Sequence, residues 1–192
     1  VLATAGETET LHREHRLDVL GFVVHEVLFD LLHHRLGALL GAEDAAQKLA
    51  GDLERRVAAV RAQVAALPTR PRVMWGYWSE PIYTAGANTM IDDVFALAGG
   101  TNVGRQAPGA WPQVSLETVV QWAPEVIITT FHPTAPDPAS LAAEVAQLQQ
   151  TAGWSSVPAI RDGRVVYVDA DLLSRPGPRL VDALEIVLRA LH

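Results

Sequence analysis

The chain has 192 residues, of which 49% are hydrophobic and 19% are charged, a composition typical of a folded globular protein. Its 22 acidic residues outnumber its 15 Lys and Arg residues, so the formal net charge is −7. This balance leaves no basic surplus for a nucleic-acid backbone or an anionic lipid surface, and we expect neither as a partner. The lack of cysteine excludes disulfides, thiolate metal sites and cysteine nucleophiles. No apolar run approaches the roughly 20 residues of a spanning helix, so we expect no direct membrane insertion.

Residues 1–41 have the pattern of an αβα fragment. An apolar run at Val1–Thr4 precedes a polar helix near Glu7–Arg16, a strand at Val19–Val24 and a helix from about Glu26 to Leu40. The sequence opens with neither Met nor the charged start of a signal peptide. We interpret the numbering as beginning inside a longer gene product.

The strongest helical pattern runs from Ala42 to Leu67. Apolar side chains recur there at intervals of three or four residues, which places them on one face of a helix: Leu49, Leu53, Val57, Val60, Val64 and Leu67. Such a helix would be roughly 35–40 Å long at about 1.5 Å per residue. The segment Pro68-Thr69-Arg70-Pro71 predicts its end.

After Pro71 the pattern changes to alternating strands and helices. Short apolar runs predict strands at 72–77, 126–130 and 165–168, and 3.6-residue periodicity predicts helices at 89–97, 116–122, 139–150 and from Leu180 to the end. The strands are apolar throughout rather than alternating, which is typical of strands buried on both faces. The sequence therefore predicts an α/β fold in which a parallel sheet is flanked by helices.

The common enzyme motifs are missing, among them the nucleotide-binding loops, H-E-x-x-H and G-x-S-x-G. A catalytic reading would need a polar pair such as Asp92 or Asp93 with His132, but the two aspartates fall on a predicted helix, where we interpret them as surface residues. The histidines at 12, 15, 25, 33 and 34 are spaced awkwardly for one metal site, and we predict no metal centre. We expect a protein that is not an enzyme and needs no cofactor.

Aromatic residues gather in two places. Trp75, Tyr77, Trp78 and Tyr83 lie within nine residues, and Trp111 lies in a loop rich in Pro and Gly. In open α/β sheets, ligands bind at the carboxyl ends of the strands, where such loops meet. We assign Trp75 to the core of its strand, whereas for Tyr83 and Trp111 the pattern leaves core and ligand roles equally open.

Glu117 follows Ser115, a natural N-cap, and falls in the first turn of a predicted helix. An acidic residue at this position ordinarily complements the helix dipole. The residue pattern alone therefore gives Glu117 a structural role.

Taken in order, several segments resemble the substrate-binding proteins of ABC importers, in the class whose two lobes are joined by one long helix and which carries cobalamin, haem and ferric siderophores. These segments are Trp78–Gly86, Ile91–Asp93, Leu97–Val103, Trp111–Glu117, Pro124–Ile128 and Ser174–Leu180. The resemblance implies a remnant of the amino-terminal lobe at 1–41, the interlobe helix at 42–68 and the carboxy-terminal α/β lobe at 69–192.

The resemblance also implies a ligand site in the cleft between lobes. By motif position its residues in this chain are Tyr77, Tyr83, Trp111, Asp171, Leu172, Leu173 and Arg175. It further implies that Glu117 docks on an arginine of the membrane permease, a role compatible with the helix-dipole one. Because one lobe supplies half a cleft, we expect residues 1–192 alone to bind ligand weakly or not at all.

The ligand implied first is cobalamin, because of the segments Trp111–Glu117 and Arg175–Arg179, with haem or a ferric siderophore as the alternative. A small α/β enzyme and a purely structural domain remain as other classes. The partners implied are the chelate ligand and the transmembrane permease of an ABC importer. The location implied is periplasmic or otherwise extracytoplasmic, with a lipid anchor on a missing amino terminus left open.

Overall fold

The computed structural model describes residues 37–130 and 138–192. The chain divides into two compact units, Val1–Arg56 with Pro176–Pro178, and Val57–Arg175 with Arg179–His192. The elements predicted before residue 37 lie outside the described residues, as do six of the seven histidines.

The described part of the first unit consists mainly of helical residues. Helix α2 (Gly37–Leu40) ends at Gly41, whose φ of 62° is a conformation that glycine adopts without strain. Helix α3 (Glu43–Ala65) then begins, with Glu43 and Asp44 in its first turn. Acidic side chains are favourable there because the amino end of a helix carries partial positive charge.

Helix α3 confirms the long helix predicted from the sequence, although it ends at Ala65 rather than Leu67. From Val57 onward it belongs to the second unit. There Val57, Val60 and Val64 are buried. Val64 approaches Gly99 so closely that a Cβ atom on Gly99 would lie 3.0 Å from one of its methyl groups. The assignment of α3 as an interlobe helix, and with it the division at 41 and 68, stays a prediction.

The second unit is built on a parallel sheet in the order β3 (Thr101–Asn102), β1 (Arg72–Trp75), β5 (Val126–Thr129), β6 (Val165–Tyr167). All three pairings are parallel, with Val73 opposite Val126 and Ile128 opposite Val166. The strand predictions at 72, 126 and 165 are confirmed, and so is the predicted α/β class.

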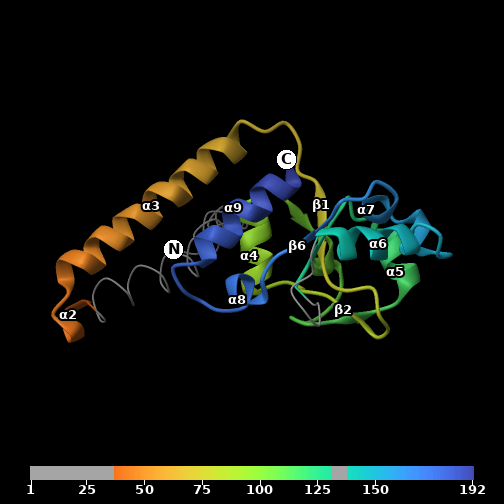
Figure 1. Cartoon of the computed structure of the whole chain (residues 1–192), viewed down its shortest axis with the longest axis horizontal. Helices are drawn as coiled ribbons and strands as arrows, with labels where there is room; N and C mark the ends of the chain where they lie inside the picture. The colour runs from red at the N-terminus through yellow and green to blue at the C-terminus, as the bar shows by residue number, and fades with distance from the viewer. Residues whose placement is uncertain (1–36, 131–137) are drawn as a thin grey trace, which may run out of the picture. The chain divides into compact units, whose positions relative to one another are not determined.

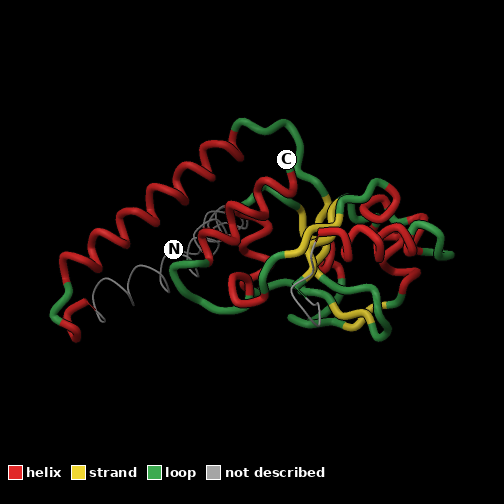
Figure 2. Tube along the Cα trace, viewed as in Figure 1, coloured by secondary structure: helices red, strands yellow, loops and turns green. Residues whose placement is uncertain are grey.

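Helices lie on both sides of this sheet (Figures 1 and 2). Helices α4 (Met90–Leu97) and α9 (Leu180–Leu191) pack together on one side, near the short α8 (Ala170–Leu173). On the other side lie α5 (Leu116–Trp122), α6 (Pro138–Leu148) and α7 (Pro158–Arg161). Met74 and Ile127 contribute to the core on this second side, together with Val145 of α6 and Ile160 of α7.

Several short elements are not predicted from the sequence. A small antiparallel ribbon pairs β2 (Ile82–Tyr83) with β4 (Gln113–Val114), β3 and α7 are not expected either, and α8 lies within the predicted loop 169–178. Two 3₁₀ turns, Val103–Gln106 and Trp154–Ser156, complete the described elements. Within the described ranges, none of the helices combines the length and hydrophobicity that a membrane span requires.

Candidate functional site

The β2–β4 ribbon lies at the carboxyl end of β1. Gly76, the residue after β1, forms an antiparallel bridge with Thr84, and the Thr84 hydroxyl donates a 2.6 Å hydrogen bond to the carbonyl of Trp75. The ribbon continues past its two paired residues, because Thr84 N donates to the Pro112 carbonyl at 3.1 Å and Gly86 N donates to the Ala110 carbonyl at 2.8 Å. These bonds hold the 82–86 segment against the 110–114 segment, at the edge of the sheet where α/β proteins bind ligands.

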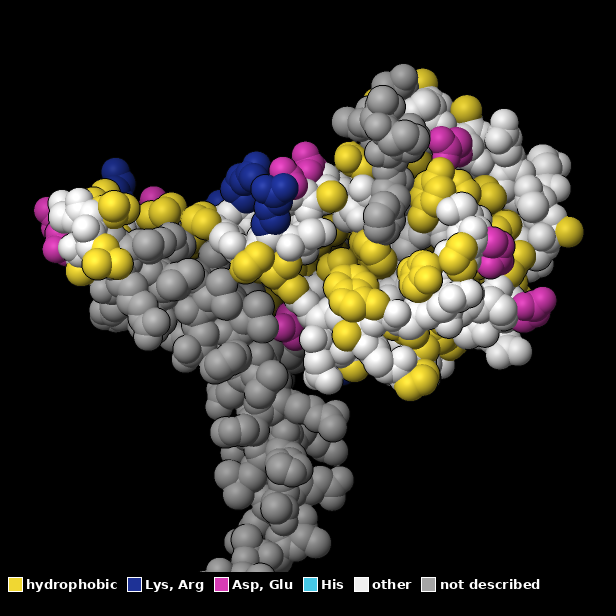
Figure 3. Space-filling model, turned by 90° about the horizontal axis from the view of Figure 1, so that it is seen from below, with side chains coloured by type: hydrophobic (Ala, Val, Ile, Leu, Met, Phe, Trp, Pro, Cys, Tyr) yellow, Lys and Arg dark blue, Asp and Glu magenta, His cyan; other side chains and the backbone are white. Residues whose placement is uncertain are grey.

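The two faces of the ribbon differ in burial. Ile82, Thr84 and Val114 point into the protein and are at most 9% exposed. Tyr83 and Trp111 are 49% and 55% exposed. Because side chains alternate along paired strands, the ribbon register places Tyr83 and Trp111 on the same outer face. Figure 3, seen from the side on which Figure 1 draws β2, shows hydrophobic side chains gathered on this face of the second unit.

Trp111 rests on a buried tryptophan. Its ring lies 5.4 Å from that of Trp75, at an interplanar angle of 70°. Trp75 is 5% exposed, as predicted for a core residue, and its indole N–H donates to the Thr130 hydroxyl at 3.2 Å. The edge-to-face contact supports the Trp111 ring from beneath and leaves its outer surface open.

Tyr77 is placed differently from Tyr83. Its ring lies 4.3 Å from that of Trp78, and its hydroxyl donates a 3.3 Å hydrogen bond to Glu144 on α6. Burial, together with the negative charge and the hydrogen bond of Glu144, raises the pKa of the Tyr77 phenol. Tyr77 is therefore held as a neutral hydrogen-bond donor, and its hydroxyl is already committed to another side chain.

The predicted ligand residues on α8 and just after it separate into two groups. Asp171 and Arg175 form an exposed ion pair at 2.9 Å, and Leu172 is half-buried. Leu173 is 0% exposed and belongs to the core. The predicted ligand role of Leu173 is not favoured by this position, because its side chain presents no surface to a ligand.

Glu117 is exposed in the first turn of α5. Ser115 caps the helix as predicted, and its hydroxyl accepts a bond from Thr118 N at 3.3 Å. A hydrogen bond from Ser115, followed by one from the Glu117 backbone, lowers the pKa of the Glu117 carboxyl. The side chain is consequently charged and accessible at neutral pH.

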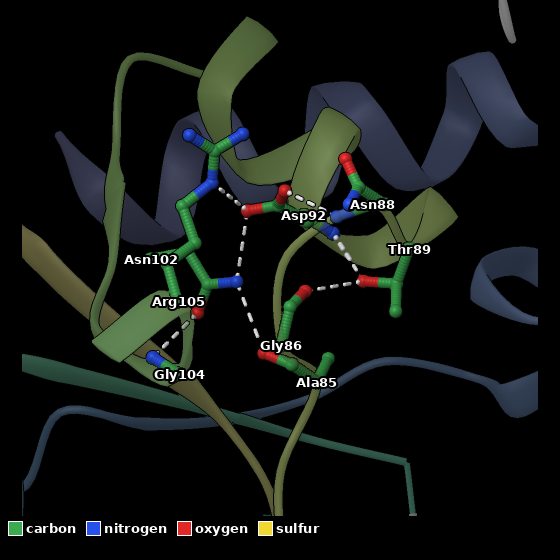
Figure 4. Close-up of polar contacts among 8 residues, drawn as sticks. All are labelled: Ala85, Gly86, Asn88, Thr89, Asp92, Asn102, Gly104 and Arg105. Carbon is green, nitrogen blue, oxygen red and sulfur yellow. Dashed lines mark hydrogen bonds and ion pairs between the residues drawn. The ribbon is translucent and has the colours of Figure 1, made fainter. Parts of the chain in front are cut away.

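The interpretation of Asp92 and Asp93 as helix-surface residues is wrong. They are 1% and 8% exposed on the inner side of α4. Asp92 accepts hydrogen bonds from Asn88 N, Asn102 and Arg105 (Figure 4). His132, the partner required by a catalytic reading, lies outside the described residues. Asp92 is thus a bonded structural group rather than a free catalytic carboxylate.

An open pocket of about 450 Å³ lies at the opposite edge of the sheet, where Pro71, Glu125 and Arg164 precede β1, β5 and β6. Arg164 donates there to the carbonyls of Ala190 and Leu191 at 3.2 and 2.9 Å. Among the described residues no group of three or more acidic or histidine side chains is arranged to hold a metal ion. Among the described residues of the second unit, the large exposed apolar side chains are Tyr83 and Trp111 of the ribbon, and neither lines this pocket.

Comparison with known proteins identifies the family of the chain. Residues 26–172 match the model of the family described as periplasmic binding protein. The chain belongs to the periplasmic binding protein family. The resemblance to substrate-binding proteins of ABC importers is thereby confirmed.

Relatives within this family are named for cobalamin. A vitamin B12-binding protein of Vibrio cholerae is 32% identical over 143 residues, which cover 73% of this chain and 47% of the relative. A cobalamin-binding protein of Halobacterium salinarum is 30% identical over 162 residues, covering 82% of this chain and 42% of the relative. The chain therefore spans about half the length of the curated relatives it matches.

Solved structures of the family share the fold and differ in ligand. The periplasmic vitamin B12 binding protein of Vibrio cholerae matches with a TM-score of 0.66 and 29% identity, over 85% of this chain and 61% of that one. A periplasmic haem-binding protein in complex with two haems matches with a TM-score of 0.68 and 27% identity, over 90% and 62%. The likeness in fold alone therefore does not separate the two kinds of ligand.

Proposed function

We propose that this protein is the substrate-binding component of an ABC importer and that it captures cobalamin or a related large chelate. The observation that carries the proposal is the half-exposed pair Tyr83 and Trp111 on one face of the ribbon at the carboxyl edge of the sheet. The names of relatives 30% and 32% identical to this chain favour cobalamin.

The proposed activity is binding without catalysis. A large ring system laid against Tyr83 and Trp111 would bury apolar surface worth about 25 cal/mol per Å². Polar groups would then fix its orientation, and the accessible Asp171–Arg175 pair offers both a hydrogen-bond acceptor and donors for amide or carboxylate substituents. If α3 joins two lobes, its 23 continuous helical residues would resist wide hinge motion, and capture would involve small adjustments.

Delivery would require a permease surface, and Glu117 is our candidate contact. Its carboxylate is exposed and its lowered pKa keeps it charged, so it is suited to meet an arginine of the transporter. The corresponding location is outside the cytoplasm. A family member of Bacillus subtilis that is 29% identical is named a substrate-binding lipoprotein, which supports that location.

The experiment is a titration of the gene product, at its full natural length, with cobalamin, haemin and a ferric hydroxamate, followed by calorimetry and tryptophan fluorescence. Cobalamin is expected to bind tightest and to quench fluorescence, because Trp111 would lie against it. If haemin or the hydroxamate binds more tightly than cobalamin, that compound is the ligand and cobalamin is not. No binding of any of the three would overturn the proposed function.

Haem is the second candidate, and the exposed hydroxyl-bearing ring of Tyr83 favours it. A phenolate can ligate haem iron, and Tyr77 is a poor choice because its hydroxyl is bonded to Glu144 and its pKa is raised. If haem is the ligand, Tyr83→Phe should abolish the Soret shift on adding haemin. Tyr77→Phe, the matched control, should leave the shift in place.

A further inference from the structure

Asp92 is the centre of a buried polar network behind the ribbon. Its side chain is 1% exposed, and both carboxylate oxygens are used (Figure 4). Oδ1 accepts from Asn102 at 2.9 Å and from the Arg105 Nε at 2.6 Å, and Oδ2 accepts from Asn88 N at 3.2 Å. A carboxylate this deeply buried is tolerated only when charged and polar partners of this kind surround it.

Asn102 connects this centre to the ribbon. Its amide nitrogen donates to Asp92 and, at 3.0 Å, to the carbonyl of Ala85, while its side-chain oxygen accepts from Gly104 N at 3.0 Å. Both donors of the amide and its acceptor are therefore engaged. An amide held in this way has one orientation, so the position of Ala85 is fixed relative to α4.

The segment beyond Ala85 is held from both sides. The Thr89 hydroxyl donates to the Gly86 carbonyl at 3.0 Å, and Gly86 N donates to the Ala110 carbonyl, one residue before Trp111. The backbone is closely packed at two glycines. A Cβ atom on Gly86 would collide with the Gly109 carbonyl oxygen, and a Cβ atom on Gly104 would collide with the Ala85 carbonyl oxygen. Hydrogen bonds thus connect Asp92 through Asn102 to Ala85, and the next residue, Gly86, is bonded to Ala110, so the network reaches both segments of the ribbon that contain Tyr83 and Trp111.

We propose that Asp92, Asn102 and Arg105 are positioning residues, which fix the orientation of the aromatic ribbon although they do not belong to its exposed face. The proposal rests on the proposed ligand-binding function of that ribbon. A binding surface that is already ordered before the ligand arrives loses less conformational entropy on binding. The affinity of the ribbon for its ligand therefore depends on the residues that keep the ribbon ordered.

Arg105 contributes a positive charge to the network. Its side chain is 46% exposed and binds Asp92 through Nε, close to Asp93, which is also buried. One positive charge therefore offsets two carboxyl groups, and removing it would leave a buried negative charge uncompensated. Such a loss weakens the network without removing a side chain from the core.

The first test is hydrogen exchange on the chain itself. Asn102→Ala removes the link between Asp92 and the Ala85 carbonyl, and it should accelerate exchange of the Thr84 and Gly86 amides roughly ten- to hundredfold, as expected for the loss of buried hydrogen bonds. Arg105→Ala, at a half-exposed position, leaves the Asn102 bonds in place and should accelerate the same amides to a smaller degree.

The control is Val187→Ala on α9, a buried site that makes none of the side-chain hydrogen bonds of the network and whose truncation lowers global stability. It should accelerate the Gly76 amide, bonded to Ile128 in the sheet, at least as much as the Thr84 and Gly86 amides, because global unfolding exposes all of them. Exchange of the Thr84 and Gly86 amides in Asn102→Ala that is unchanged, or accelerated no more than that of Gly76, would overturn the positioning role.

The second test measures affinity of the full-length gene product for cobalamin. Asn102→Ala and Arg105→Ala should weaken binding roughly tenfold, whereas Val187→Ala should bind like the unmodified protein at a temperature where all are folded. Equal affinities across the set would overturn the proposal. If the unmodified protein ignores cobalamin, the proposed function fails, but the exchange result still decides whether the network positions the ribbon.

Discussion

Trp111 lies edge-on against Trp75, with ring centroids 5.4 Å apart, so that one indole is exposed and the other is buried beneath it. The two residues therefore have different roles in one contact. Trp75 supplies a rigid base, and Trp111 supplies the surface that we assign to the ligand.

This difference predicts unequal stability losses. Trp75→Ala should cost about 3–5 kcal/mol because it opens a cavity in the core. Trp111→Ala should cost only about 1 kcal/mol, the worth of an aromatic pair at a half-exposed site. Urea denaturation of the two variants measures this, and comparable losses would show that Trp111 is a core residue after all.

Asp93 predicts a dependence of stability on pH. Burial, and next the charge of Asp92, raise the Asp93 pKa from 3.8 to about 6, while Arg105 acts in the opposite direction. Between these values the folded protein holds the proton more tightly than the unfolded chain. The stabilisation is therefore complete below about pH 4 and is lost as the pH rises through 6.

Asp93→Asn, which resembles the protonated form, should raise the free energy of unfolding by about 1–3 kcal/mol near pH 7.5 and change it little near pH 4. Asp162→Asn is the control, because Asp162 is exposed at the C-cap of α7 and its pKa is lowered by Arg161. An equal gain from Asp93→Asn at both pH values would contradict the assigned shift.

Substituting alanine for either of two glycines should change the stability of the protein in opposite directions. Gly86→Ala should destabilise the protein by roughly 1–3 kcal/mol, since the new methyl group meets the Gly109 carbonyl oxygen in the ribbon. Gly51→Ala should stabilise it by about 0.5–1 kcal/mol, because Gly51 lies in α3 and a Cβ there meets only Arg55 at 3.6 Å. Thermal unfolding of both variants decides this. A tolerated Gly86→Ala would mean that the ribbon can shift.

The sequence predicts most of the sheet and its helices because their signals are local. Val126–Thr129 is a short run of apolar and β-branched residues, and Ser115 marks the start of α5 by its capping hydroxyl. The two-residue strands β2 and β4 carry no such signal, since their pairing depends on a partner some thirty residues away. The ribbon becomes apparent only in the folded chain, where the two segments meet.

The sequence pattern also gives no sign of the polar network around Asp92. An aspartate in the first turn of a helix is usually exposed, and Asp92 follows a Thr89 cap as an exposed residue would. Its burial becomes apparent only when Asn102 and Arg105 are brought to it by β3 and the following 3₁₀ turn. A first-turn aspartate does not reveal whether the fold will cover it.

The central claim is that the exposed face of Tyr83 and Trp111 binds a bulky chelate, and calorimetry with cobalamin tests it most directly. In the full-length gene product, Trp111→Ala should weaken cobalamin binding roughly tenfold or more, because stacking and apolar burial are both lost. Arg161→Ala, an exposed residue on α7 paired with Asp162, should leave the affinity unchanged. Cobalamin affinity that is the same with and without the Trp111 ring would contradict the account.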